Sequence, residues 1–194
     1  MPQVAFDAQA HRYTVDGKPV PGVSRILEAA GLKDMRHADP AAMQRGTYVH
    51  EAVSLDYEGD LDEATLHPSL AGYVEGFRRW KIEMGVEVIA NEHRVFQPHL
   101  LYCGTADWIV RMQGRTWVID LKSGAPAPWH CAQLAAYALA YQIEAGGPTP
   151  ARAGLYLAEE GQYRFHPYKE RSDFDLWKAA VVIGRWRIEK GLFA

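Results

Sequence analysis

The chain has 194 residues, with 21 lysines and arginines against 24 aspartates and glutamates, which gives a formal net charge of −3. Its hydrophobic content of 48% is ordinary for a globular protein, and this length supports one domain with a buried core. No run of about 18 apolar residues is present, which excludes a membrane-spanning helix. Two cysteines without a CxxC pair exclude a four-cysteine zinc or iron–sulfur site and favour a reducing compartment such as the cytoplasm.

The first half of the chain is predicted to form a small β-hairpin followed by helices. Short apolar runs on both sides of the Asp16-Gly17 dipeptide predict the hairpin and its turn. An acidic loop is expected over Tyr57–Glu63. Apolar residues at helical spacing, with Pro40 suited to a first helical position, predict helices over Val23–Ala30, from Pro40 through Val53, and over about Pro68–Met84.

The second half combines β-rich runs with helical patterns. Three strands are expected at Val86–Phe96, Tyr102–Met112 and Arg115–Leu121. A helix over about Trp129–Glu144, a hairpin of two strands and a last helix over Ser172–Lys190 are expected to follow. The two strands of that hairpin are expected at Ala153–Leu157 and Gln162–Pro167. This order predicts an α/β fold in which a mixed central sheet of about five strands is flanked by helices.

Two carboxylates are predicted to face each other on neighbouring strands. If Gln113 and Gly114 form a two-residue turn, Asp107 and Asp120 are equally far from it and lie opposite each other. Both faces of this hairpin are otherwise apolar, as expected for strands covered by helices, so the two carboxylates would be buried. Two buried like charges require a cation or a shared proton. Lys122 projects from the same face as Asp120, so the sequence predicts a charged site at this strand end.

The Asp-x-Lys pattern alone carries little information. It arises by chance about once in every two chains of this length, and Asp16-Gly17-Lys18 provides a second copy within the predicted turn. The helix after the third strand contains Gln133 and Tyr137 one turn apart, and His50 lies on an apolar helix face. Each of these three residues alone is typical of ordinary packing. Beside two carboxylates, however, a neutral imidazole is a suitable further metal ligand.

Four segments resemble motifs of the PD-(D/E)xK nuclease superfamily, in its RecB-like, phage-type exonuclease branch. In chain order they are Gly46–Glu51, Gly104–Asp107, Val118–Gly124 and Gln133–Tyr137. The resemblance implies a restriction-endonuclease-like core within a single nuclease domain over 1–194, with the hairpin and short helix in 1–38 and the nuclease core in 39–194. Ala106 stands where the name of the superfamily has a proline. The cysteines that hold an iron–sulfur cluster in some relatives are absent, so no such cluster is expected.

The resemblance implies a metal-dependent DNA exonuclease that hydrolyses phosphodiester bonds in phage or bacterial recombination, repair or DNA processing. The catalytic residues would be Asp107, Asp120 and Lys122. The metal ligands would be His50, Asp107, Asp120 and the backbone carbonyl of Leu121. The residues that support the site or contact nucleic acid would be Gln133 and Tyr137, with Glu92 and Arg45 as further candidates. Carboxylates with one imidazole suit Mg²⁺ or Mn²⁺.

The implied partner is single- or double-stranded DNA in the cytoplasm of a bacterium or of a phage-infected host, and the resemblance also allows a single-strand annealing or recombination partner protein. No membrane partner is expected, and the sequence does not indicate an oligomeric state. Two other functions stay open: a structure-specific endonuclease with the same site, and a catalytically inactive nucleic-acid-binding module. The charged residues of the predicted site disfavour the inactive module, because buried charges that cost stability have no reason to persist without activity. A structural zinc site lacks the necessary close spacing of cysteines and histidines.

Overall fold

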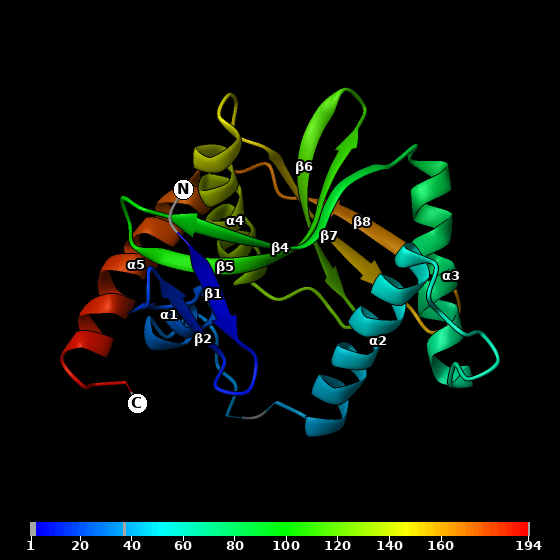
Figure 1. The fold of residues 1–194 in the computed structure, drawn as a ribbon, viewed down its shortest axis with the longest axis horizontal. Helices are drawn as coiled ribbons and strands as arrows, with labels where there is room; N and C mark the ends of the chain where they lie inside the picture. Colours follow the sequence, from blue (N-terminus) through cyan, green and yellow to red (C-terminus); the bar gives the residue numbers. More distant parts are fainter. Residues whose placement is uncertain (1–2, 37, 194) are drawn as a thin grey trace.

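A computed structural model describes residues 3–36 and 38–193 of the chain, which form two β-sheets and five α-helices (Figure 1). The small sheet contains β1 (Val4–Asp7), β2 (Arg12–Val15) and β3 (Lys18–Val20), paired antiparallel in chain order. The large sheet has the strand order β4 (Glu87–Gln97), β5 (Tyr102–Met112), β6 (Arg115–Lys122), β7 (Ala151–Leu157) and β8 (Tyr163–Pro167). Only β6 and β7 pair in parallel, so the five-stranded sheet is mixed, as predicted.

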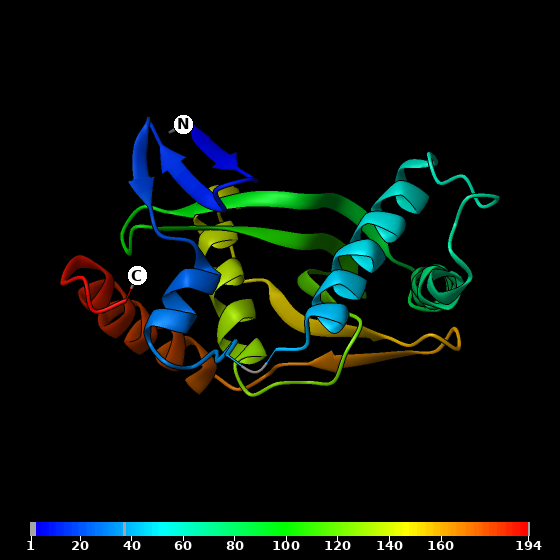
Figure 2. The ribbon, with the colours of Figure 1, turned by 90° about the horizontal axis from the view of Figure 1, so that it is seen from below.

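The helices are α1 (Val23–Ala29), α2 (Pro40–Glu58), α3 (Pro68–Glu83), α4 (His130–Ala145) and α5 (Ser172–Glu189). They bury two separate sets of apolar side chains against the large sheet. The first set combines α1, α4 and α5 with β4, β5 and β6, and the second combines α2 and α3 with β5, β6 and β7. Figures 1 and 2 show the two groups of helices on opposite sides of the molecule. Covering helices explain why both faces of β6 are apolar.

The element order confirms the predicted architecture, and the boundaries differ at a few points. Helix α2 continues to Glu58, where an acidic loop had been expected from Tyr57 onward, and ends at Gly59 with a φ of 80°. The ring of Tyr57 packs edge-on against Trp108, with centroids 5.2 Å apart, which favours one more helical turn. Strand β7 begins two residues earlier than predicted, because Ala151 pairs with Trp117. Within the residues that the structure describes, no helix is long and apolar enough to cross a membrane.

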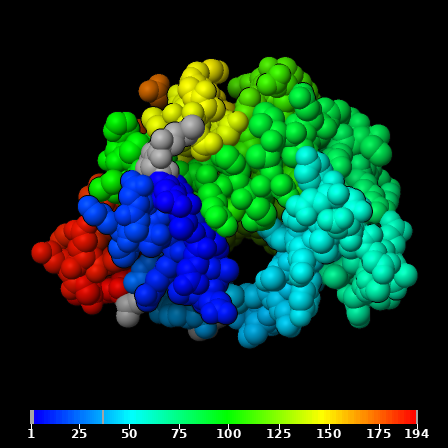
Figure 3. Space-filling model, in the orientation of Figure 1, coloured from blue at the N-terminus to red at the C-terminus, as the bar shows by residue number. Residues whose placement is uncertain are grey.

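Helix α2 begins with a well-formed cap and leads to the predicted site. The side chain of Asp39 accepts a hydrogen bond from the Ala41 N–H at 3.0 Å, and Pro40 occupies the first turn. Val49 and Val53 anchor the middle of the helix in the core, whereas its first two turns are mostly exposed. His50 lies between these two parts. Figure 3 shows a hollow between α2 and the N-terminal segment, beside the strands drawn in green.

Candidate active site

The hairpin of β5 and β6 has the predicted turn and register. Gln113 and Gly114 both have positive φ, at 53° and 71°, as a two-residue hairpin turn requires. Pairing runs from Met112–Arg115 to Trp108–Ile119 and stops there. The predicted register is therefore confirmed, but the expected cross-strand pair of Asp107 and Asp120 is not formed.

The side chain of Asp107 replaces that missing backbone pairing. Its Oδ2 accepts a hydrogen bond from the N–H of Leu121 at 2.7 Å. The backbone amide of Leu121 is thereby satisfied where the strands separate. Asp107 is thus fixed at the point where β5 leaves β6.

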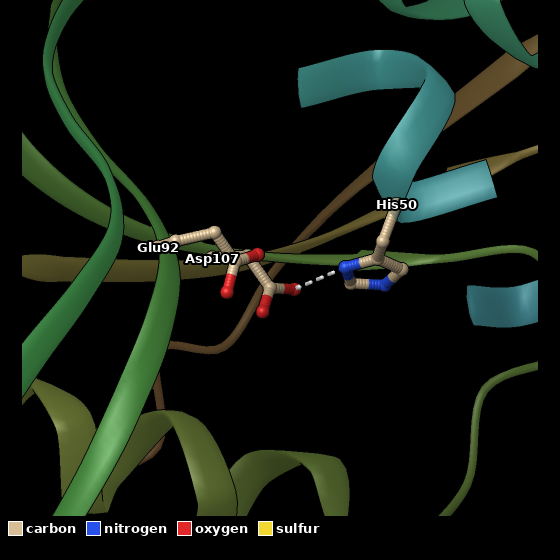
Figure 4. Close-up of side chains that lie close together, drawn as sticks. All are labelled: His50, Glu92 and Asp107. Carbon is tan, nitrogen blue, oxygen red and sulfur yellow. Dashed lines mark ion pairs between the residues drawn. The ribbon is translucent and has the colours of Figure 1, made fainter. Parts of the chain in front are cut away.

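The neighbouring strand β4 is distorted at the same level. Asn91 pairs with Trp108 and His93 pairs with Ala106, but Glu92 and Asp107, which lie between them, form no pair. Glu92 has a φ of 44°, in the left-handed region that a non-glycine residue seldom adopts. Such local strain persists only where the surrounding structure imposes it, and it is common at functional sites. Figure 4 shows the carboxylates of Glu92 and Asp107 side by side.

His50 reaches this pair from α2 (Figure 4). Its Nε2 lies 2.9 Å from the carbonyl oxygen of Leu121, and its Nδ1 lies 3.8 Å from Oδ2 of Asp107. Because a carbonyl oxygen only accepts, Nε2 carries the proton, and in the neutral ring Nδ1 presents a lone pair toward Asp107. Two electron-pair donors that face each other leave a place for a cation. The Leu121 carbonyl, which the resemblance implies as a metal ligand, here accepts the hydrogen bond from His50.

The donor atoms of His50, Glu92 and Asp107 all lie within 4.8 Å of one another. Burial, together with Asp120 and Glu92, raises the pKa of Asp107 to about 7, although His50 and Lys122 oppose this shift. Burial, assisted by Asp120, also raises the pKa of Glu92. The carboxylates are therefore unfavourable in their charged form without a counter-ion. Oxygen donors with one imidazole nitrogen fit a divalent cation, and these three residues would hold it.

Asp120 has a different partner. It is almost completely buried, and its Oδ2 lies 2.6 Å from the Nζ of Lys122. Burial lowers the pKa of Lys122, but Asp120 and Asp107 raise it more strongly, so the net shift is upward and the ammonium stays charged. The ring centroid of Trp129 lies 5.7 Å from the same Nζ. Asp120 therefore holds a charged ammonium beside the three clustered ligands.

Helix α4 lies beside the site, on the side of the first set of apolar side chains. The Nε2 of Gln133 donates a hydrogen bond to the hydroxyl of Tyr137 at 3.0 Å, and both residues are buried. Burial, followed by the charges of Asp120 and Asp107, raises the pKa of Tyr137 well above its ordinary value, so the hydroxyl stays neutral. Gly104 allows this contact, since a Cβ at that position would lie 2.6 Å from the Tyr137 ring. Gly104 of the second motif thus contacts Tyr137 of the fourth motif.

Comparisons with known proteins identify the family of the chain. The family profile described as the PD-(D/E)XK nuclease superfamily matches residues 25–194. The chain belongs to this superfamily. Its members are nucleases that use divalent metals, and membership supports nuclease activity for the chain. No curated protein matched the chain in the sequence comparison.

Two solved structures are similar to the chain. The alkaline exonuclease LHK-Exo from Laribacter hongkongensis is 15% identical, with 88% of each chain covered and a TM-score of 0.42. LHK-Exo in complex with dAMP is also 15% identical, with 90% of this chain and 95% of that chain covered and a TM-score of 0.38.

Two further residues, Arg45 and Tyr156, lie outside the group of His50, Glu92 and Asp107. Arg45 is exposed on α2 and forms no ion pair within 3–36 and 38–193. Sequence reasoning missed Tyr156, whose hydroxyl lies 2.9 Å from Nδ1 of the buried His130 and 2.8 Å from the hydroxyl of Tyr168. Tyr156 is the parallel-strand partner of Lys122, so this network braces the strand end behind the ammonium. Only knowledge of the β6–β7 pairing could have identified it.

Proposed function

We propose that the chain is a Mg²⁺- or Mn²⁺-dependent DNA exonuclease. The observation that carries the proposal is the group of His50, Glu92 and Asp107, whose donor atoms lie within 4.8 Å of one another. The charged Asp120–Lys122 pair lies beside this group on β6. The four sequence motifs support exonuclease action on DNA and a place in phage or bacterial recombination, repair or DNA processing. As part of the same proposal, the whole chain acts as one nuclease domain.

Each residue would have a separate task in phosphodiester hydrolysis. His50, Glu92 and Asp107 would hold the metal, which when bound would supply Lewis acidity to the phosphate and lower the pKa of a water. Asp120 would orient Lys122 through their 2.6 Å contact. The ammonium of Lys122 would then stabilise the negative charge that develops on the phosphate oxygens in the transition state.

Residues outside the cluster would maintain and serve the site. Gln133 and Tyr137 would support the carboxylates as neutral groups, because an ionised tyrosine there would repel Asp107 and Asp120. The amide oxygen of Gln133 is buried and accepts no hydrogen bond from the described residues, so it would be free to accept one from a water or from the substrate. Arg45, exposed on α2, would contact the phosphate backbone.

The test compares linear and closed circular forms of one plasmid, and the same sequence as a single strand, with Mg²⁺, with Mn²⁺ and with EDTA. The proposal expects linear DNA to be degraded to short products in either metal, closed circles to persist, and EDTA to stop all cleavage. Asp107→Asn, purified in the same way, should be inactive and so excludes a contaminating nuclease.

Three results would overturn the proposal. Nicked or linearised circles would show an endonuclease. A mobility shift without cleavage would show a binding module, and cleavage in EDTA would show that no metal is needed.

A further inference from the structure

Helix α5 has an apolar face that no other part of the described chain covers. Val182 is 70% exposed and Trp186 is 53% exposed, and Leu176 and Ile183 are exposed as well. With the exposed Ala179 these residues follow helical spacing along nearly three turns, so they form one continuous stripe. Scattered exposed apolar residues are ordinary, but a contiguous patch indicates an interaction surface. We call this stripe the α5 face.

The opposite side of α5 already has its packing partners. Trp177, Ala180 and Val181 are buried in the core with α1 and α4. Gly184 packs so closely on α1 that a Cβ there would lie 2.6 Å from the carbonyl oxygen of Ile26. Rotation of α5 therefore cannot bury the exposed stripe. A helix that is apolar on both sides is typical of one that is covered on both sides.

The charges at the two ends of the α5 face are opposite. Asp175 lies exposed in the first turn, 3.7 Å from Lys178, whereas Arg187 lies in the last turn and Lys190 directly follows the helix. Across residues 3–36 and 38–193, neither Arg187 nor Lys190 has a carboxylate within 4.0 Å. An antiparallel partner helix with the same charges would bring its Lys190 to Asp175 and its Asp175 to Lys190, whereas Arg187 would lie level with Lys178 of the other copy. The helix dipoles would also be antiparallel, which is the favourable arrangement.

The side chains on this face are also complementary in size to a second copy. In an antiparallel pair centred between Val182 and Ile183, the small Ala179 lies opposite the large Trp186 of the other copy. The same register places Asp175 opposite Lys190 in both halves of the pair, because a two-fold interface repeats each contact. Large side chains opposite small ones allow two helices to approach closely.

We propose that the α5 face is a two-fold, antiparallel self-association surface and that its occupant is a second copy of this chain. Leu176 and Trp186 are separated by about 15 Å along the helix, so the interface is smaller than the roughly 800 Å² per partner of a standard complex. The dimer should therefore be reversible, with a Kd in the micromolar range. In Figures 1 and 2, α5 lies away from α2, which carries His50, so pairing leaves the candidate active site open.

Sedimentation equilibrium of the full chain, from about 1 to about 200 µM, tests the proposal on both sides of the expected Kd. The wild type should change from monomer to dimer, and Val182→Asp should stay monomeric throughout. Ile82→Asp is the matched control, because Ile82 is 81% exposed but lies on α3. This variant should dimerise like the wild type. Thermal unfolding of both variants should match the wild type, since both positions are exposed. A wild-type chain that stays monomeric, or a Val182→Asp dimer, would overturn the proposal.

Charge reversal tests the antiparallel register itself. Asp175→Lys places two lysines opposite each other at both ends, and Lys190→Asp places two aspartates there, so each variant alone should dimerise about tenfold more weakly. An equimolar mixture of the two variants should recover wild-type association, because every facing pair in the mixed dimer is again of opposite charge. A mixture that associates no better than its components would refute the antiparallel pairing. A general loss of folding could not be repaired by mixing.

Discussion

Replacement of Asp107 by asparagine should stabilise the metal-free protein at neutral and alkaline pH, although it removes a proposed metal ligand. Burial and the neighbouring Asp120 and Glu92 raise the pKa of Asp107 from 3.8 to about 7. Between these two pH values the unfolded chain has lost a proton that the folded chain still binds. The free energy of unfolding therefore decreases as the pH rises through this window, and the loss is complete above pH 7.

The magnitude follows from the size of the shift. About three pH units at 1.36 kcal/mol each give a penalty of about 4 kcal/mol above pH 7, of which about 1.5 kcal/mol is already present at pH 5. Asparagine cannot ionise there, and its amide oxygen can still accept the hydrogen bond from Leu121. The stability advantage of Asp107→Asn over the wild type should thus increase by about 2–3 kcal/mol between pH 5 and pH 8.

Urea unfolding in EDTA at pH 5, 6, 7 and 8 measures this advantage, and a parallel series in Mg²⁺ should reverse it. Bound metal stabilises the folded wild type by mass action, by about 2.7 kcal/mol at one hundred times its Kd, whereas the variant has lost a ligand. Asp60→Asn, at an exposed position after α2, is the control. Its difference in free energy of unfolding from the wild type should stay constant between pH 5 and pH 8. An Asp107→Asn protein less stable than the wild type at pH 8 in EDTA would refute the reasoning. So would an advantage that stays constant from pH 5 to pH 8.

Three further substitutions test other parts of the site. Lys122→Met should lower the single-turnover cleavage rate at saturating Mg²⁺ by about 10²–10³-fold, while metal binding measured by calorimetry and DNA binding are retained. The control is Lys18→Met, in the second Asp-x-Lys pattern. A Lys122→Met protein that cleaves at the wild-type rate would show that Lys122 is not catalytic. His50→Ala should raise the Mg²⁺ concentration for half-maximal activity about tenfold or more, and an unchanged titration would make His50 a packing residue. Gly104→Ala should lower the free energy of unfolding, measured in urea, by about 1–3 kcal/mol, because its Cβ would clash with Tyr137. Gly124→Ala should leave the free energy of unfolding unchanged, because no atom lies within 4 Å of the added Cβ. Equal effects of the two substitutions would contradict the close contact between Gly104 and Tyr137.

Local signals explain why much of the fold was predictable from the sequence. The Gln113-Gly114 turn determines the β5–β6 register, since a two-residue turn with positive φ leaves only one pairing. The helices follow from apolar spacing and from Pro40 at the start of α2. The closeness of the last three motifs also followed, because they lie on this hairpin and on the helix that comes after it.

The departures have a different origin, since they depend on contacts between elements distant in the sequence. Glu92 has its left-handed backbone within β4, between two residues that pair with β5, and no residue near Glu92 in the sequence indicates this conformation. The Leu121 carbonyl bonds to His50 only because α2 packs across the end of β6. Tyr156 comes beside Lys122 through a parallel pairing whose register is set by the whole crossover of α4. Sequence reasoning could identify the charged groups but not which partner each one finds.

The distribution of partners explains how three carboxylates can lie in one site, although only Asp120 is fully buried. Glu92, Asp107 and Asp120 together carry three negative charges when ionised, and Lys122 neutralises one of them through its contact with Asp120. With His50 neutral, two negative charges remain on the two carboxylates that lie with its imidazole within 4.8 Å. One divalent cation balances these two charges, whereas a monovalent cation would leave one negative charge uncompensated. The ammonium and the metal would therefore not be interchangeable. In the proposed function, Asp120 would hold Lys122, and Glu92, Asp107 and His50 would hold the ion.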